Sequence, residues 1–343
     1  MSALYAIPGL IWPAAGLEQA ITAQPLPGLS ALLSAAQISR QAPQSLESWL
    51  AAQFGAEPQT PWAALRQVSE SPANTDGETI WVCADPVSLR LTREFMLLDG
   101  ADVLDLQAGE LQALEQSLNE NFADVGRFSF CAERGYLALD ARHADKLAST
   151  LSPLADVLGR PVAHFQPQGE QAAWWSRLAN ELQVFCHNHP VNTAREARGA
   201  APLNGIWLWG AGRLPAKLKA PARSVAGPAH LLAGLAHCAG TALQNSNSLH
   251  AADWIVLDAL IKPARERDLD AWLKALQRLD AQIFLSLSHK LKQGQLDAVQ
   301  IIAPGDTQLT QFDIHPRPFW KFWQKPASLA QIAHLLSEDP AKR

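Results

Sequence analysis

The sequence predicts an α/β protein with a doubly wound, mostly parallel sheet and an inserted α+β domain. Apolar strand-like runs alternate with amphipathic helices in the C-terminal half, which is the order that βαβ units produce. Residues 75–165 differ, because an amphipathic helix is followed there by two short alternating strands. We therefore expect a discontinuous α/β core domain made of residues 1–74 and 166–343, interrupted by the inserted domain at 75–165.

Composition and charge narrow the class of protein. The chain has 343 residues, 48% hydrophobic and 18% charged, enough for a large core and two domains. A net charge of −5 without an uninterrupted basic cluster argues against a nucleic-acid partner. No apolar run approaches the roughly 18 residues of a membrane helix. The four cysteines are far apart and are expected to be reduced thiols in a cytoplasmic protein.

Turn and cap residues predict the first strand and the first two helices of the chain. A buried strand at 3–12 ends in a Pro-Gly turn, and a helix at 26–39 starts with another. A helix at 45–55 begins with Ser45 and Ser48, the pattern of an N-terminal cap. The polar segment 68–79 predicts the first domain boundary.

The inserted domain has its own pattern. Residues 79–91 predict a strand, and leucines spaced three and four apart predict a helix at 106–122. Residues 127–132 and 135–140 alternate apolar and polar side chains around a short turn, which predicts a hairpin.

After the inserted domain, the sequence patterns of helices and strands alternate again in the core domain. A helix from 171 ends near His187, because Pro190 cannot continue it. Further strands are predicted at 205–210, 253–260 and 297–306, and further helices at 227–240 and 269–291. Ligands in such sheets bind beyond the carboxyl ends of the strands. The loops after Trp209, Leu257 and Ala303 are therefore the predicted ligand loops.

The segment 187–212, HNHPVNTAREARGAAPLNGIWLWGAG, is the candidate site. Arg195 and Arg198 lie three apart and can project from one side of a short turn capped by Asn192. Two guanidinium groups beside helix-start amides suit a phosphate or carboxylate. The alternative is a capped turn whose arginines form surface salt bridges, and the residues leave both interpretations open. The predicted ligand-binding residues are His187, His189, Asn192, Arg195, Arg198, Asn204, Gly210 and Gly212.

Two further features of this segment are weaker indications of a binding site. His187 and His189 are two residues apart and have no nearby third ligand, so no metal site is predicted. Gly210 and Gly212 form a G-x-G without the third glycine of a dinucleotide fingerprint. They are more typical of a tight turn or a close backbone approach.

The same segment resembles the cofactor-independent phosphoglycerate mutases of archaeal type, within the alkaline-phosphatase superfamily. The shared pattern is H-P-V-N, an arginine, G-x-x-P-x-N and G-x-G, after a helix with Asn180-Glu181. The sequence is more similar still to a bacterial branch of RpfE-type regulatory proteins, which share I-P-G-L-x-W-P at 7–13 and A-D-P-V at 84–87. The resemblance implies an alkaline-phosphatase-like core with an inserted domain.

The resemblance also implies a loss of catalysis. The mutases need two divalent metals and a hydroxyl nucleophile. Their first strand ends in Asp-Gly, where this chain has Pro8-Gly9, and their Gly-Asp-His is here 305–307, Gly-Asp-Thr. Their segment with further ligands corresponds to 262–270, which has no histidine.

Three functions stay open. The first is a catalytically degenerate, phosphomutase-like protein with a regulatory role, which binds a small phosphorylated or carboxylated metabolite. For this function no cofactor is expected, and no catalytic residue can be assigned. The second is an active metal-dependent phosphotransferase, such as a phosphoglycerate mutase, with rearranged ligands. The third is a scaffold that binds a protein partner through a Trp-rich surface near Trp320 and Trp323. The rearranged ligands of the second hypothesis would be Asp258, Asp306, His289 and His315.

Overall fold

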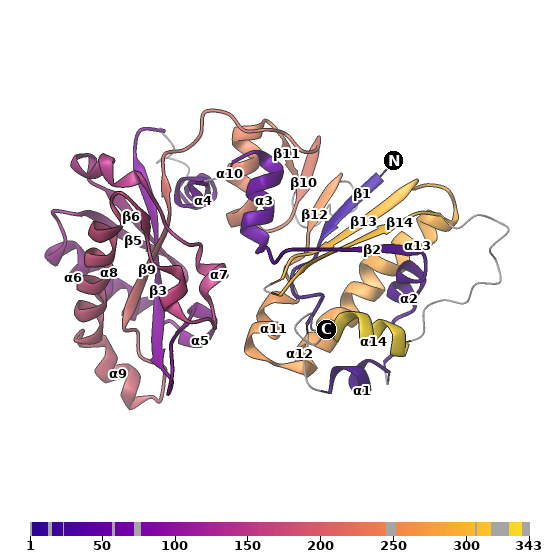
Figure 1. The fold of residues 1–343 in the computed structure, drawn as a ribbon, viewed down its shortest axis with the longest axis horizontal. Coiled ribbons are helices and arrows are strands. Elements are labelled where there is room, and N and C mark those ends of the chain that lie inside the picture. The colour runs from indigo at the N-terminus through magenta and orange to yellow at the C-terminus, as the bar shows by residue number, and fades with distance from the viewer. Residues whose placement is uncertain are drawn as a thin grey trace. The chain divides into compact units, whose positions relative to one another are not determined.

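A computed structural model describes residues 2–12, 16–22, 24–56, 59–71, 77–244, 252–305, 307–316 and 329–337. The chain divides into two compact units (Figure 1). The first unit contains Met1–Leu50, Pro221–Pro228 and Thr241–Arg343, and the second contains Ala51–Ala220 and Ala229–Gly240.

The first unit is built on a seven-stranded, mostly parallel sheet in the order β11-β10-β12-β1-β13-β14-β2. The five strands from β11 to β13 are mutually parallel, whereas β14 runs antiparallel to both of its neighbours. The predicted mixed α/β fold with a mostly parallel sheet is thereby confirmed, and it is consistent with the alkaline-phosphatase-like core that the resemblance implies. The strands are β1 (Ser2–Ala6), β2 (Ala36–Gln41), β10 (Ser224–Ala226), β11 (Ala242–Gln244), β12 (Trp254–Val256), β13 (Ala298–Ala303) and β14 (Leu309–Ile314).

The helices of the first unit pack against this sheet, and together they bury one continuous apolar cluster. Ile255, Ile301 and Phe312 of the strands pack in one cluster with Leu276 and Phe284 of the helices. The helices are α1 (Leu17–Thr22), α2 (Pro27–Leu33), α11 (Ile261–Glu266), α12 (Leu269–Leu279), α13 (Leu285–Lys292) and α14 (Leu329–Ser337), and α3 (Leu46–Phe54) continues into the second unit.

The long helix predicted at 269–291 contains a π-helical turn. Residues Asp280–Phe284 form that turn between α12 and α13. The buried Asp280 carboxylate there accepts hydrogen bonds from the backbone N–H groups of Gly28 (3.2 Å) and Leu29 (2.6 Å). These are unpaired donors of the first turn of α2, which has no side-chain cap of its own. Asp280 therefore supplies the cap from a distant part of the chain.

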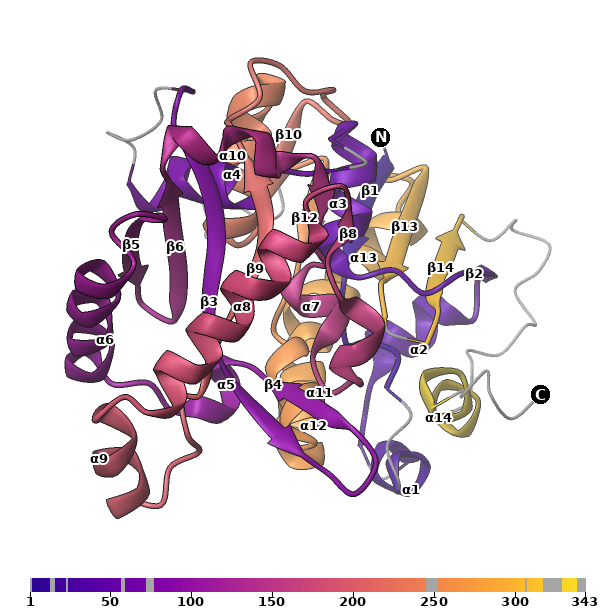
Figure 2. The ribbon, with the colours of Figure 1, turned by 60° about the vertical axis from the view of Figure 1, so that its left-hand side comes forward.

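The second unit contains an antiparallel sheet in the order β4-β3-β6-β5, with β9 paired to β3 (Figure 2). Strand β3 is long, so β6 pairs with its first half and β4 with its last residues, while β9 follows the other edge. The strands are β3 (Ile80–Leu91), β4 (Met96–Asp99), β5 (Gly126–Cys131), β6 (Arg134–Leu139) and β9 (Gly205–Gly212), and β7 (Ser149–Thr150) pairs with β8 (Gln168–Gly169).

The helices of this unit flank that sheet. Leu114 and Leu118 of one helix pack with Trp175 and Leu182 of another in a single buried cluster. The helices are α4 (Trp62–Glu70), α5 (Ala101–Leu104), α6 (Ala108–Asn121), α7 (Leu154–Val157), α8 (Ala172–His187), α9 (Val191–Ala197) and α10 (Ala229–Ala239), with 3-10 helices at Ala141–Leu147 and Val162–Phe165.

The unit boundaries differ from those predicted. The inserted domain was expected at 75–165, but the second unit also contains α4, α8, α9, β9 and α10. The cause is β9, which was expected in the parallel core sheet. It pairs antiparallel with β3 instead, with Ala84 opposite Leu208 and Val87 opposite Gly205. The loop after Trp209 therefore does not follow a strand of the parallel sheet.

Two further observations concern the described residues. None of their helices is both long enough and apolar enough to span a membrane. Cys83, Cys131, Cys186 and Cys238 are all free thiols.

Candidate functional site

The predicted segment 187–212 folds as a helix end, a short helix and a strand. Helix α8 ends at His187, α9 begins after Pro190, and β9 starts at Gly205. The segment lies against α5 and α6, elements that precede it by about 90 residues in the sequence, as the Arg198–Asp105 separation of 93 residues shows.

Arg195 is a fully buried structural residue. Its side chain is 0% exposed, its Nε donates to the carbonyl of Ala201 (2.8 Å), and its terminal nitrogens donate to Glu110 and to the carbonyl of Leu104. Leu104 ends α5, so the cation also satisfies a carbonyl at a helix C-terminus. The surface position expected for this arginine is wrong, because its guanidinium is enclosed by Glu110 and by the backbone of Leu104 and Ala201.

Arg198 completes an ionic cluster, named here the α9 clamp, of Asp105, Glu110, Arg195 and Arg198. Its guanidinium donates to Glu110 (2.9 Å) and to Asp105 (2.7 Å). Burial opposes ionisation of Glu110, but the backbone N–H of Gln107 and the two arginines outweigh it and lower the pKa of Glu110. Both arginines therefore face a carboxylate of the protein itself, but the Arg195 ion pair is buried and is not the surface salt bridge that the structural interpretation expected.

The asparagines of the segment bind backbone groups. The expectation that Asn192 caps a turn is wrong, because Asn192 lies inside α9, whose N-cap is Pro190. Asn192 donates to the carbonyls of Cys186 (2.8 Å) and Leu203 (3.0 Å) and accepts from the N–H of Leu203 (2.8 Å). Asn204 exchanges two hydrogen bonds with the backbone of Leu89, at 2.7 and 3.0 Å. These bonds fix the loop between α9 and β9 to α8 and to β3.

The two histidines have different environments. His187 is exposed at the end of α8. His189 is 8% exposed; its Nδ1 accepts from the N–H of Val191 (3.2 Å) and its Nε2 faces the Ser117 hydroxyl at 3.0 Å. Burial disfavours the charged form of the ring and lowers the pKa of His189. It joins α6 to the start of α9.

Gly210 and Gly212 allow β9 to lie close to α4. A Cβ on Gly210 would be 2.8 Å from the Cβ of Trp62, and a Cβ on Gly212 would be 2.8 Å from the Cβ of Pro61. Gly210 also has a left-handed φ of +58°. The prediction of a close backbone approach is confirmed.

A buried charge next to these glycines escaped the sequence analysis. Asp85 accepts hydrogen bonds from the Trp209 indole N–H (2.7 Å), the Gly135 backbone N–H (3.0 Å) and Arg66 (3.4 Å). Arg66 also stacks over the Trp209 ring at 4.5 Å. The A-D-P-V motif at 84–87 contained this aspartate, but its three partners come from distant elements. The arrangement is a buried structural hub that joins α4, β3, β6 and β9 through Asp85.

The carboxyl edge of the parallel sheet in the first unit carries few ligand groups. The chain passes through Pro8-Gly9 after β1, Asp258 after β12 and Gly305 after β13, while Asp306 lies outside the described residues. Asp258 is exposed. Among the described residues no three His, Cys, Asp or Glu side chains gather into a metal-binding group. The described donors at this edge therefore do not fit the two-metal centre that the resemblance implies.

The rearranged ligand set is not assembled by the residues described. Because β14 runs antiparallel to β13, with Ile314 opposite Val299, His315 follows β14 at the amino edge of the parallel strands. Asp258 follows β12 at the opposite, carboxyl edge. Trp320 and Trp323, which carry the scaffold hypothesis, lie outside the described residues.

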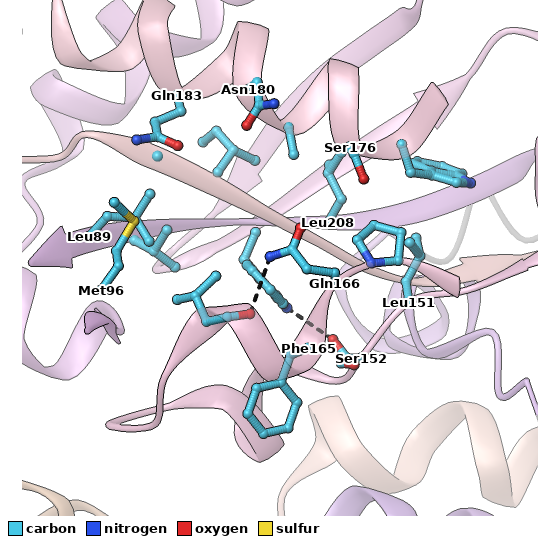
Figure 3. Close-up of a pocket in the computed structure, with 18 residues that line it drawn as sticks. Leu89, Met96, Leu151, Ser152, Phe165, Gln166, Ser176, Asn180, Gln183 and Leu208 are labelled. Atoms are coloured by element: carbon cyan, nitrogen blue, oxygen red, sulfur yellow. Dashed lines mark hydrogen bonds between the residues drawn. The ribbon is translucent and has the colours of Figure 1, made fainter. Parts of the chain in front are cut away.

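A cavity of about 260 Å³ lies in the second unit, lined by 18 residues from α8, β3, β4, β9 and the segment 151–167 (Figure 3). It was not predicted from the sequence. The one feature of the local sequence that could have indicated this cavity is a row of three polar residues on one face of α8, namely Ser176, Asn180 and Gln183.

Two known proteins similar in sequence to this chain are described as phosphoglycerate mutases. No family model matches. A probable 2,3-bisphosphoglycerate-independent phosphoglycerate mutase of Geobacter sulfurreducens is 25% identical over 57% of this chain and 56% of its own length. The corresponding mutase of Methanothrix thermoacetophila is 24% identical over 49% of this chain and 50% of its own length. The chain thus spans about half the length of these relatives.

The fold is shared with a solved structure. The PH0037 protein from Pyrococcus horikoshii matches with a TM-score of 0.52 and 13% identity, over 92% of this chain and 87% of that one. A cofactor-independent phosphoglycerate mutase from Thermoplasma acidophilum aligns with a TM-score of 0.40, too low to support an argument. The chain is a mixed α/β protein homologous, at low identity, to the cofactor-independent phosphoglycerate mutases. The finer prediction of an RpfE-type regulatory branch stays a prediction.

Proposed function

We propose that this chain is a phosphoglycerate-mutase-like protein that does not catalyse phosphoryl transfer and has a regulatory, ligand-binding role. The observation that carries the proposal is the end of β1. The resembled mutases place a metal-binding aspartate there, and this chain has Pro8 followed by Gly9. Proline offers no side-chain ligand, and a divalent cation needs oxygen or nitrogen donors.

The local packing supports this proposal. The Gly9 carbonyl accepts a hydrogen bond from the Trp272 indole N–H at 2.8 Å. Gly9 has a φ of +76°, and a Cβ there would be 2.8 Å from the Leu260 carbonyl oxygen. The turn after β1 is therefore closed by the Trp272 side chain of α12 and by the backbone of Leu260, the N-cap of α11. A two-metal reaction loses both its nucleophile and its charge stabilisation when several ligands are absent.

The regulatory part of the proposal rests on the resemblance to RpfE-type proteins. The phosphate-binding part is weakened by the α9 clamp, since Arg195 and Arg198 already bind Glu110. A ligand of this protein is therefore expected to bind away from the α9 clamp.

The test is an assay of phosphoglycerate interconversion with the purified full chain, in excess Mn²⁺ and in EDTA. The Geobacter sulfurreducens relative serves as the positive control, and cooperative thermal unfolding shows that the chain is folded. We expect no turnover above the EDTA background. Metal-dependent interconversion by this chain would overturn the proposal.

A further inference from the structure

The cavity of the second unit has a consistently uncharged wall. None of the 18 described residues that line it carries an ionisable side chain. Leu89, Met96 and Phe165 contribute apolar side chains to the lining, and Figure 3 shows Leu89 beside Met96. A phosphate or carboxylate placed there would lose its hydration without gaining a counter-charge, which costs far more than apolar contacts return.

One side of the cavity is polar. Ser176, Asn180 and Gln183 lie at positions i, i+4 and i+7 of α8, so they project from one face of the helix. Figure 3 shows all three along the α8 side of the cavity. Their side chains make no hydrogen bond with any other described residue. Other polar groups of the wall are used internally: Gln166 donates to the Val162 carbonyl (3.2 Å) and Trp207 to the Ser152 carbonyl (2.9 Å).

The size of the cavity limits its occupant. Its volume of about 260 Å³ lies just below the range of about 300–1,000 Å³ usual for small-molecule sites. Such sites are mainly apolar with a few polar groups that orient the ligand. This cavity has the same division between an apolar floor and a polar row.

We propose that the cavity binds a small uncharged molecule with an apolar body and one hydroxyl, arylamine or amide group. The apolar body lies on Leu89, Met96 and Phe165, and the polar group bonds to the side chains of Ser176, Asn180 or Gln183. This is a different ligand class from the phosphorylated compound in the names of the relatives. The proposal is independent of whether the chain is an enzyme, since the wall residues belong to the second unit alone.

Two fluorescent dyes test the ligand class on the unmodified full chain. N-Phenyl-1-naphthylamine is uncharged, and 8-anilino-1-naphthalenesulfonate has the same aromatic skeleton with an added sulfonate. We expect saturable one-to-one binding of the uncharged dye and about ten-fold or more weaker binding of the sulfonate, because no cation offsets its charge. Equal or tighter binding of the sulfonate would overturn the proposal.

Two substitutions on α8 test the location. Ala179 lines the cavity, so Ala179→Phe fills the space, and we expect the affinity for the uncharged dye to fall by about ten-fold or more. Ala173→Phe places the same side chain on the exposed face of the same helix and should leave the affinity unchanged. Unchanged binding by folded Ala179→Phe would show that the dye binds elsewhere. If that variant fails to fold, the two-dye comparison still decides the ligand class, and Gln183→Leu tests the location by the same titration.

Discussion

The indole N–H of Trp209 donates a 2.7 Å hydrogen bond to the buried carboxylate of Asp85. The two residues are 124 positions apart, on the paired strands β9 and β3. The same carboxylate faces Arg66, whose side chain is 7% exposed. A tryptophan in the candidate segment thus helps to hold a buried charge pair.

Removing the charge of Asp85 should destabilise the second unit. Asp85→Asn removes the counter-charge that this carboxylate supplies to the buried Arg66, which typically costs about 3 kcal/mol. Urea unfolding followed by circular dichroism measures the loss. Asp99→Asn is the control, because its partner Arg90 is 57% exposed, and such pairs contribute about 1 kcal/mol or less. Equal effects of the two substitutions would contradict the role assigned to Asp85.

The α9 clamp predicts a large cost for Arg195→Ala. This substitution leaves Glu110 without its buried partner and frees the Leu104 carbonyl, so we expect a loss of about 3 kcal/mol or more in the free energy of unfolding. Arg177→Ala, on the exposed face of α8, should change it by less than about 0.5 kcal/mol. A loss below about 1 kcal/mol for Arg195→Ala would mean that the clamp does not stabilise the fold.

The lowered pKa of Glu110 predicts a specific acid sensitivity. The pKa lies below the ordinary value of 4.5 in the folded state, so near that pH the unfolded chain binds more protons than the folded one. The stabilisation is therefore complete well above pH 4.5 and is lost as the pH falls through the folded pKa. Urea midpoints measured from neutral pH to about pH 3 should fall more steeply for the wild type than for Glu110→Gln. Parallel curves would refute this assignment.

Substitutions at two glycines with similar backbone angles distinguish backbone strain from steric overlap. Gly210 has φ +58° and lies against Trp62, while Gly199 has φ +70° and nothing within 4 Å of an added Cβ. Both alanine substitutions incur left-handed strain of about 1 kcal/mol. Gly210→Ala should cost a further 1–3 kcal/mol, roughly, because Trp62 must move. Thermal unfolding of the two variants measures the difference, and equal midpoints would count against the close approach of β9 and α4.

Local patterns predicted most helices and several strands of this fold. The three- and four-residue spacing of leucines placed α6 and α12, and Pro190 marked the end of α8, because these signals depend on neighbouring residues only. Ser45 caps α3 as expected, accepting from the N–H of Ser48 at 3.2 Å.

Contacts between residues that are far apart in the chain could not be predicted from the sequence. An apolar run such as GIWLWG suits a parallel core strand and an antiparallel strand equally, so β9 was assigned to the wrong sheet. Arg195 has the sequence signature of a surface residue, and only its pairing with Glu110, 85 positions away, makes it internal. The cavity of the second unit depends on side chains of α8, β3, β4, β9 and the segment 151–167, and a single sequence does not show which of these elements meet.

The placement of β1 at the centre of its sheet has a consequence for synthesis. Its partners are β12 and β13, with Leu4 opposite both Trp254 and Gln300. Nearly three hundred residues must leave the ribosome before this N-terminal strand can gain both neighbours. A chain that stops early would expose the unpaired edges of β1, and exposed edges pair with other chains. We therefore expect nascent and C-terminally truncated forms to depend on chaperones far more than the finished protein does.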